Sequence, residues 1–376
     1  MDFVKNPWIG SGKKNQEVQP AKEDFLRNLI PRVKEAREFH QTLTVYRPTS
    51  LHNLQQKADK LGINKLYVKD ESERFGLQAF KGLGASFALN QILKNRENDL
   101  PSKDLTFVTA TDGNHGRGLA WAAKSLGHHS VVFLPKGTDP YRLRIIEEEG
   151  ARVILTDSNY DDTVMMAEEY AHKYNGILVQ DTMWEGYKEI PQWIIEGYGT
   201  IALETIDELE KDGVTPTHIF LQAGVGSFAA AMMSIFKSYY DREDLTFILV
   251  EPARANCFYQ SFHYSEDTRV EGDLNTVMAG LACGKANPLA LYIAEKFASG
   301  IFSVEDDLAE KGVDILARPL GEDPKIIAGE SGAVTMGVLE SLCKGSYREL
   351  RSFLDISDRS VVLTINTEGN TSGKLY

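Results

Sequence analysis

A glycine-rich segment, Gly224-Val225-Gly226-Ser227, offers the first chemistry in this 376-residue chain. Glycines let the backbone approach an anion closely, and a following helix directs free N–H groups and the positive end of its dipole at that anion. The Ser227 hydroxyl adds a further donor. The segment favours a phosphate site, with the type of cofactor open. It also fits a dinucleotide fingerprint in which Glu251 would contact a ribose, and the plain alternative is a tight turn that binds nothing.

Lys81 is the second candidate group. It stands at the start of an amphipathic stretch, next to Phe80 and with glycines on both sides. In an apolar cleft a lysine has a lowered pKa and becomes a nucleophile that can form a Schiff base. Taken alone, the position is more typical of a solvated surface lysine, so both interpretations stay open.

A third segment, Thr111-Asp112-Gly113-Asn114-His115, follows an expected strand and opens an expected helix. Asp112 or Asn114 could simply cap that helix. Alternatively, Asn114 hydrogen-bonds a ligand oxygen while the N–H groups of the turn hold a carboxylate. We expect His115 to be packed or hydrogen-bonded. No second histidine stands at metal-ligand spacing and the three cysteines form no CxxC pattern, so we expect no metal.

Short β-rich runs alternate with helical patterns along most of the chain. Strands are expected at 65–70, 105–112, 130–135, 152–156, 177–181, 217–224, 245–252 and 360–369, and helices at 81–95, 116–126, 140–149, 160–174, 190–211 and 287–298. This alternation predicts an α/β protein with mainly parallel sheets covered on both faces. Ligands bind at the carboxyl ends of such strands, and the three candidate segments all follow strands.

Two clusters of strands, separated by the long helical pattern after Pro191, predict two α/β domains with a cleft between them. We expect a large cofactor-binding domain made of residues 1–85 and 190–376, and a small domain, 86–189, inserted into it. The active site is expected in the cleft between the two.

Composition narrows the class of protein. Hydrophobic residues make up 42% and charged residues 25%, as in an ordinary globular protein, and the formal charge is −13. An acidic surface argues against nucleic acids and anionic membranes as partners. The sequence has no apolar run of about eighteen residues and no signal peptide at its start, so we expect no membrane span and a cytoplasmic enzyme.

Seven motifs in order, from about residue 45 to 370, make a more specific pattern. They are VKDESERFGLQAFK, ATDGNHGRG, NYDDTV, VQDTMWEGY, QAGVG, MAGLACG and GESGAV, and a final TEGN follows them. Together they resemble the diaminopropionate ammonia-lyases, a family of fold type II (tryptophan-synthase-β-like) pyridoxal-phosphate enzymes.

The resemblance implies pyridoxal 5′-phosphate as cofactor and gives each motif a role. Lys81 would form the Schiff base, Asn114 would contact the ring hydroxyl, and Thr367 would face the pyridine nitrogen. The phosphate would be held by Gly224, Val225, Gly226 and Ser227. A neutral partner such as Thr367 leaves the ring nitrogen largely unprotonated, which suits elimination over transamination.

The implied reaction is α,β-elimination of D- and L-2,3-diaminopropionate to pyruvate and two ammonia, through aldimine, carbanion and aminoacrylate. Thr111 would receive the substrate carboxylate. Asp112 departs from the serine or threonine usual at its position, and a carboxylate there is sensible only if the substrate carries an extra ammonium. We expect Lys81 to be the base on one face and Asp112 the base for the D-isomer, while Asp181 binds the distal ammonium.

The same family places cysteines at the positions of Cys257 and Cys283, which implies a possible disulfide near the active-site entrance. In a reducing cytoplasm we expect free thiols as the resting state. The family also implies a homodimer. Three alternatives stay open: a serine/threonine dehydratase-type lyase on the same fold, a nicotinamide-dependent dehydrogenase, and a cofactor-carrying protein without turnover.

Overall fold

The computed structural model describes residues 1–9, 19–96, 104–111, 113–345 and 347–371. Its large sheet has seven strands in the order β1 (Asp2–Lys5), β10 (Ala298–Val304), β9 (Thr246–Pro252), β8 (His218–Gln222), β11 (Val361–Asn366), β3 (Lys65–Asp70) and β2 (Leu51–Asn53). The edge strands β1 and β2 are antiparallel to their neighbours, and the five inner strands are parallel. In the centre, Val362 of β11 lies opposite Leu66 on one side and His218 on the other.

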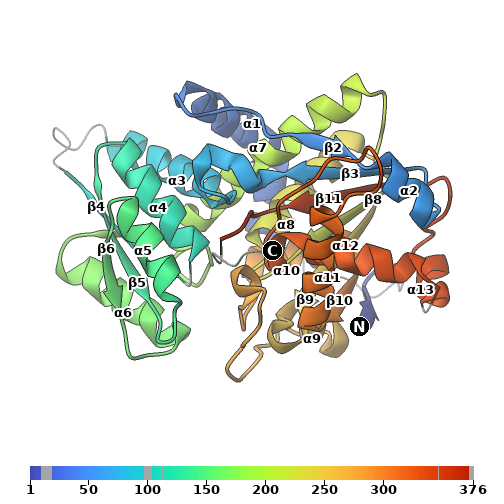
Figure 1. Ribbon diagram of the computed structural model, residues 1–376. Helices are drawn as coiled ribbons and strands as arrows, with labels where there is room; N and C mark the ends of the chain where they lie inside the picture. Colours follow the sequence, from blue (N-terminus) through green and yellow to red (C-terminus); the bar gives the residue numbers. More distant parts are fainter. Residues whose placement is uncertain (10–18, 97–103, 112, 346, 372–376) are drawn as a thin grey trace.

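A second sheet forms the lobe on the left of Figure 1. Its four parallel strands are β6 (Arg152–Leu155), β5 (His129–Leu134), β4 (Thr106–Ala110) and β7 (Ile177–Leu178). Helices α4 (Asn114–Ser125), α5 (Pro140–Glu148) and α6 (Tyr160–Lys173) connect them. These elements all lie inside the segment 86–189, but the division of the chain into domains at those boundaries stays a prediction.

Helices cover both faces of the large sheet. The core on one face contains residues of α1 (Pro20–Thr42), α3 (Lys81–Arg96), α7 (Glu189–Lys211), α8 (Ser227–Tyr240), α9 (Cys257–Tyr264) and α10 (Pro288–Phe297). The core on the other face is formed with α2 (Gln55–Leu61), α11 (Asp306–Ala317), α12 (Glu330–Cys343) and α13 (Arg348–Phe353). Alternate residues of one strand enter the two cores, as the period of two requires: Ile219 of β8 points to the first and Phe220 to the second. Three short 3₁₀ helices complete the list: η1 (Glu71–Gly76), η2 (Ala253–Ala255) and η3 (Ala279–Leu281).

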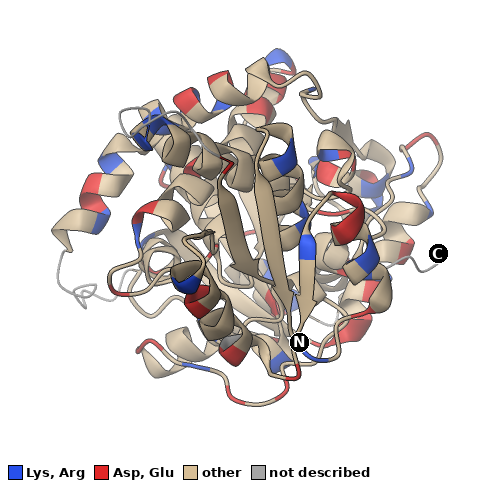
Figure 2. Ribbon diagram, turned by 90° about the vertical axis from the view of Figure 1, so that its left-hand side faces the viewer, with Lys and Arg blue, Asp and Glu red and all other residues tan. Residues whose placement is uncertain are grey.

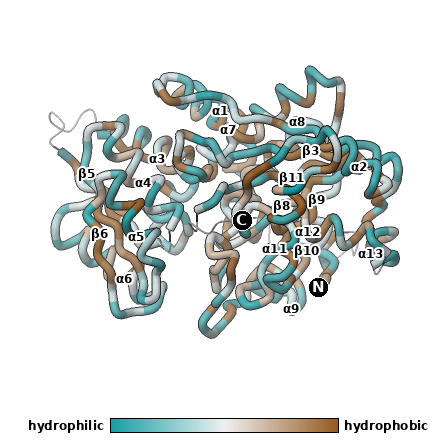
Figure 3. Tube along the Cα trace, in the orientation of Figure 1, coloured by the Kyte–Doolittle hydropathy of each residue, from teal (hydrophilic) through white to brown (hydrophobic). Residues whose placement is uncertain are grey.

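Hydropathy follows this architecture. In Figure 3 the strands of both sheets are the most hydrophobic parts of the chain. In Figure 2 acidic and basic residues are interspersed along the outer helices and loops, around strands that carry few charges. Among the described residues, no helix combines the length and the apolar character that a membrane crossing needs.

The predicted elements are confirmed where the pattern was strong. Each of the eight expected strand runs contains a strand, and each of the six expected helices is present within two residues at either end. The strands β1, β2 and β10 were not predicted. β10 begins Ala-Ser-Gly, which is weak β sequence, and Gly300 is required because a Cβ there would lie 2.3 Å from the Phe3 ring of β1.

Buried charges hold the segment that leads to Lys81. Arg74 in η1 is 1% exposed, and its guanidinium donates to Glu71 at 2.8 Å and to Glu204 of α7 at 2.7 Å. Lys69 of β3 is fully buried beside the same Glu204 carboxylate, at 3.2 Å. Because each of these charges is paired, the turn is fixed against α7 without an uncompensated buried charge.

The two sheets meet at the start of α3. A Cβ at Gly118 of α4 would lie 2.9 Å from the backbone nitrogen of Gly82, so only glycine permits this approach. The first turn of α3, which carries Lys81, therefore packs directly against a helix of the small sheet.

Candidate active site

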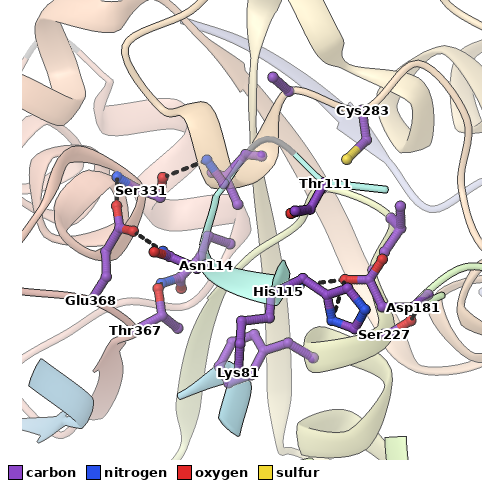
Figure 4. A pocket seen from close by; sticks show the side chains of 18 of the residues that line it. Lys81, Thr111, Asn114, His115, Asp181, Ser227, Cys283, Ser331, Thr367 and Glu368 are labelled. Atoms are coloured by element: carbon purple, nitrogen blue, oxygen red, sulfur yellow. Dashed lines mark hydrogen bonds and ion pairs between the residues drawn. The ribbon is translucent and has the colours of Figure 1, made fainter. Parts of the chain in front are cut away.

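A pocket of about 810 Å³ lies between the two sheets, at the carboxyl ends of their strands (Figure 4). Its walls come from both. Lys81, Asn114 and Ser227 are the first residues of α3, α4 and α8, and Asp181 and Thr367 closely follow β7 and β11. Helix N-termini and strand ends thus converge on one cavity, the arrangement that ligand sites of α/β proteins have.

Lys81 and Asp181 form a close ion pair inside this pocket. The amine lies 2.6 Å from Asp181 Oδ2, and the two side chains are only 16% and 9% exposed. Burial is the largest single influence and acts to lower the pKa of Lys81. The Asp181 carboxylate, together with Tyr198 and Cys283, nevertheless holds that pKa above its usual range. Burial likewise disfavours the charged Asp181, yet the Lys81 ammonium lowers its pKa to about 2.

His115 lies behind this pair. Its Nε2 is 2.9 Å from the carbonyl oxygen of Val179, which accepts a hydrogen bond, and its Nδ1 is 3.9 Å from Asp181 Oδ2. Burial lowers the pKa of His115, so the ring is neutral near pH 7. The expected packed and hydrogen-bonded histidine is confirmed, but sequence reasoning gave it no place in the site.

The glycine-rich loop presents backbone to the cavity. Gly226 has φ +89°, and a Cβ there would lie 2.2 Å from the Phe258 ring, while a Cβ on Gly224 would lie 3.0 Å from Leu281 Cα. Gly226 therefore excludes a larger residue, and Gly224 leaves little room for one. The Ser227 hydroxyl donates to the Asp181 carbonyl oxygen at 2.8 Å, which links the loop to the small sheet. The 14-residue helix α8 begins here, so its first N–H groups and dipole favour an anion in the loop.

Two adjacent residues after β11 complete the floor. Thr367 Oγ1 accepts a hydrogen bond from Gln222 Nε2 at 2.8 Å. Glu368 is 5% exposed, and its carboxylate accepts from Asn114 Nδ2 at 2.5 Å and from the backbone N–H of Ser331 at 3.2 Å. Sequence reasoning missed Gln222 and Glu368, although both stand inside motifs already singled out, QAGVG and TEGN.

The structure brings most of the predicted site residues together. Lining the pocket are Lys81, Thr111, Asn114, Asp181, Gly224, Val225, Gly226, Ser227 and Thr367. Asp112 lies outside the described residues. Among the residues that the structure describes, no three His, Cys, Asp or Glu side chains form a group that could hold a metal ion.

The two cysteines of the predicted bridge both lie close to Gly224. Cys283 lines the pocket, whereas Cys257 is fully buried with its Sγ 3.8 Å from the Gly224 carbonyl oxygen. Both carry free thiols in the structure, as does Cys343. A reversible bridge between Cys257 and Cys283 stays a prediction.

The sequence matches known proteins along most of its length. Residues 42–367 match the family described as pyridoxal-phosphate dependent enzyme. Diaminopropionate ammonia-lyase of Escherichia coli strain K12 is 44% identical over 357 residues, which are 91% of this chain and 89% of that protein. The chain belongs to the diaminopropionate ammonia-lyase family. The Salmonella typhimurium member is also 44% identical, over 90% of this chain and 89% of its own.

Solved structures of this family confirm the fold. The crystal structure of the E. coli diaminopropionate ammonia-lyase in complex with an aminoacrylate–PLP azomethine reaction intermediate superposes with a TM-score of 0.89. It is 42% identical and covers 98% of this chain and 94% of its own. The same enzyme in complex with D-serine gives a TM-score of 0.89 at 40% identity. The predicted fold type II α/β architecture, with mainly parallel sheets, is therefore correct.

The pocket fits the cofactor of this family, pyridoxal 5′-phosphate. A buried amine, a loop whose glycines leave its backbone open to an anion, and a hydroxyl held on the pocket floor are all present. The dinucleotide interpretation of the loop is wrong. Glu251, its expected ribose contact, is fully buried and accepts hydrogen bonds from the backbone N–H groups of Phe258 and Tyr259.

Proposed function

We propose that this protein eliminates both amino groups of 2,3-diaminopropionate, giving pyruvate and two ammonia. The observation that carries the proposal is the Lys81–Asp181 pair at 2.6 Å in a pocket shared by both sheets. It places a carboxylate, which suits a substrate with a second ammonium, beside the amine that would bind the cofactor. Identity of 44% to two diaminopropionate ammonia-lyases supports it.

Bound at Lys81, pyridoxal phosphate would withdraw electrons from the substrate α-carbon. The Gly224–Ser227 loop would hold its phosphate, Asn114 its ring hydroxyl and Thr367 its ring nitrogen. Thr111 would receive the substrate carboxylate. These assignments rest on the position of each residue along the pocket wall and on the family's motifs.

Three groups would handle protons and charge. The Lys81 amine, once released by the incoming substrate amine, would take the α-proton from one face. Asp181, as a carboxylate, would bind the distal ammonium of the substrate. Asp112 would take the α-proton of the D-isomer from the other face. A positioned base of this kind contributes about 10²–10⁴-fold.

The deciding experiment measures 2-oxo acid release by cofactor-loaded protein with D- and L-2,3-diaminopropionate, L-serine and L-threonine. Turnover of diaminopropionate well above the hydroxy amino acids is expected, and a preference for serine or threonine would make the protein a dehydratase instead. In the same assay Asp112→Asn should lose D-activity and keep most L-activity. An equal loss of D-activity and L-activity would show that Asp112 is not the base for the D-isomer.

We also propose a cytoplasmic homodimer whose small domain, 86–189, is inserted into the large one. Support for the dimer and the compartment comes from the family's motifs and the acidic composition. Light scattering on the eluting holoenzyme should give twice the 41.9 kDa chain mass. A mass of one chain would contradict the homodimer.

A further inference from the structure

Gln222 makes an unusual pair of hydrogen bonds below the pocket. It is the last residue of β8, only 2% exposed, and β8 is the neighbour of β11. Its Nε2 donates to the carbonyl oxygen of Ile365 at 3.0 Å and to Thr367 Oγ1 at 2.8 Å. Both hydrogens of one amide nitrogen are therefore used, on two acceptors of the same segment.

The orientation of this amide is fixed by its surroundings. If the amide were rotated by half a turn, its carbonyl oxygen would face the Ile365 carbonyl oxygen, and two acceptors would oppose each other. In the observed orientation Oε1 is buried and finds no hydrogen-bond donor among the described residues. The two N–H hydrogen bonds thus fix the orientation of the Gln222 side chain. They do so although the unpaired, buried Oε1 destabilises this arrangement.

This arrangement determines what the Thr367 hydroxyl can do. Its oxygen accepts from Gln222, so its own proton is left for another acceptor. Among the hydrogen bonds of the described residues, none has this hydroxyl as donor, and Thr367 lines the pocket.

We propose that Gln222 is a positioning residue that fixes the Thr367 hydroxyl as a hydrogen-bond donor into the pocket. This inference rests on the proposed function, in which the acceptor is the ring nitrogen of pyridoxal phosphate. A nitrogen that receives a hydrogen bond keeps its lone pair engaged and stays unprotonated. Gln222 does not contact the ring itself. It acts through Thr367, which would contact the ring nitrogen, and so favours elimination.

The test compares Gln222→Met, Thr367→Val and the double variant with the wild type. Methionine keeps the volume and removes the donor, and valine removes the hydroxyl. The readouts are NMR of cofactor labelled at the ring nitrogen, and kcat/KM for L-2,3-diaminopropionate. We expect the ring-nitrogen signal of Gln222→Met to move toward that of a protonated pyridine, and kcat/KM to fall roughly threefold to tenfold, the worth of one hydrogen bond.

The double variant decides between positioning and plain stability. If Gln222 acts through Thr367, adding Gln222→Met to Thr367→Val changes neither readout further. An unchanged nitrogen signal in Gln222→Met, or a full further loss in the double variant, overturns the proposal. The two proposals fail in different ways. Wild-type protein that never takes up the cofactor would overturn the proposed function, whereas a loaded protein whose nitrogen signal does not respond to Gln222→Met would overturn only the role of Gln222.

A second variant guards against misfolding of the first. In Gln222→Glu a carboxyl oxygen lies beside Thr367. If the carboxyl is ionised, this oxygen can only accept, and it accepts from the Thr367 hydroxyl. If the carboxyl is protonated, its proton goes to the Ile365 carbonyl oxygen, so the same oxygen again accepts from the Thr367 hydroxyl. The hydroxyl would then turn its lone pair to the pocket. The nitrogen signal should move further toward the protonated form than in Gln222→Met, and a signal equal to wild type would contradict the proposal.

Discussion

The ion pair between Lys81 and Asp181 controls how readily the amine can react with an aldehyde. Burial alone would lower the pKa of Lys81, and the Asp181 carboxylate reverses that effect. Asp181→Asn removes the largest influence that raises this pKa, so the pKa of Lys81 should fall and the neutral amine should form at lower pH. We expect covalent uptake of pyridoxal phosphate by the apoprotein to reach half its maximal rate at a lower pH than in wild type.

Stopped-flow absorbance over a pH series measures this uptake directly. Asp157→Asn, which changes an exposed aspartate outside the lining of the pocket, is the control and should behave as wild type. The same Asp181→Asn variant should lose diaminopropionate turnover despite faster uptake. A pH profile that does not move would show that Asp181 does not set the charge of Lys81.

Residues inside contiguous motifs were predictable, and residues whose roles depend on distant partners were not. Lys81, Asn114 and Ser227 each begin a helix after a turn whose chemistry is visible in the sequence. The role of Gln222 arises from a partner 145 residues away, and that of Glu368 from one 254 residues away. No local pattern carries such information, because it depends on which strands become neighbours.

At the scale of elements, the turn between β8 and α8 depends on Gly226. Alanine there would carry a φ of +89° and would place its Cβ 2.2 Å from Phe258. Gly137 has nearly the same φ, +88°, with nothing within 4 Å of its Cβ position, so Gly137→Ala isolates the backbone strain. We expect Gly137→Ala to lose about 1–2 kcal/mol of unfolding free energy. Gly226→Ala should lose about 1–3 kcal/mol more from overpacking.

Urea unfolding of both apoproteins measures the difference, and equilibrium dialysis measures cofactor retention. Gly226→Ala should retain less pyridoxal phosphate, while Gly137→Ala should retain as much as wild type. Equal losses of stability in the two variants would mean that Phe258 yields easily and that the close approach is not what requires glycine.

The contact of α4 with α12 depends on Glu368. Its carboxylate joins Asn114, at the start of α4, to the backbone N–H of Ser331 in the first turn of α12. In Glu368→Gln the new NH₂ group would face a donor in either orientation, the Asn114 NH₂ group or the Ser331 N–H. We expect roughly tenfold weaker retention of the cofactor, as for one buried polar group left unpaired.

Thr371→Val is the matched control, because Thr371 donates to the same Glu368 carboxylate at 3.1 Å and its removal leaves the Asn114–Glu368 hydrogen bond in place. It should change cofactor retention much less. If both variants weaken retention equally, Glu368 acts by holding its own loop and not by orienting Asn114.

The whole molecule places its site where two separate sheets meet (Figure 1). The alternation of strands and helices was enough to predict both parallel sheets and a site at their strand ends. It was not enough to predict how the sheets face each other. That placement depends on non-local contacts, such as the glycine-permitted approach of α4 to α3 and the Lys81–Asp181 and Asn114–Glu368 pairs.

Global stability should depend on pH through buried carboxyls, and Glu251 most of all. Burial raises its pKa to about 8, although two backbone N–H groups partly offset this, and its ordinary value is 4.5. The unfolded chain therefore ionises near 4.5 while the folded chain keeps the proton until about 8. Unfolding releases a proton throughout this window, so the free energy of unfolding falls as the pH rises, and it levels off above about 8.

Other buried groups change the free energy of unfolding mainly at lower pH. Burial lowers the pKa of His40 to about 3, so its contribution rises with pH only up to its ordinary value of 6.5. Burial raises the pKa of Glu196 and of Glu295 to about 7. Because Glu196 and Glu295 still titrate in part between about pH 7 and 8, the contribution of Glu251 is separated by substitution of that residue.

Glu251→Gln removes this titration. Since glutamine cannot ionise, the unfolding free energy of the variant minus that of wild type should grow between about pH 5 and 8 and stay constant above. Urea unfolding at each pH measures it, and the exposed Glu243→Gln should run parallel to wild type. Loss of a hydrogen bond to Phe258 or Tyr259 shifts the Glu251→Gln curve by a constant amount only. A difference that does not change with pH would therefore mean that the Glu251 carboxyl is ionised in the folded protein.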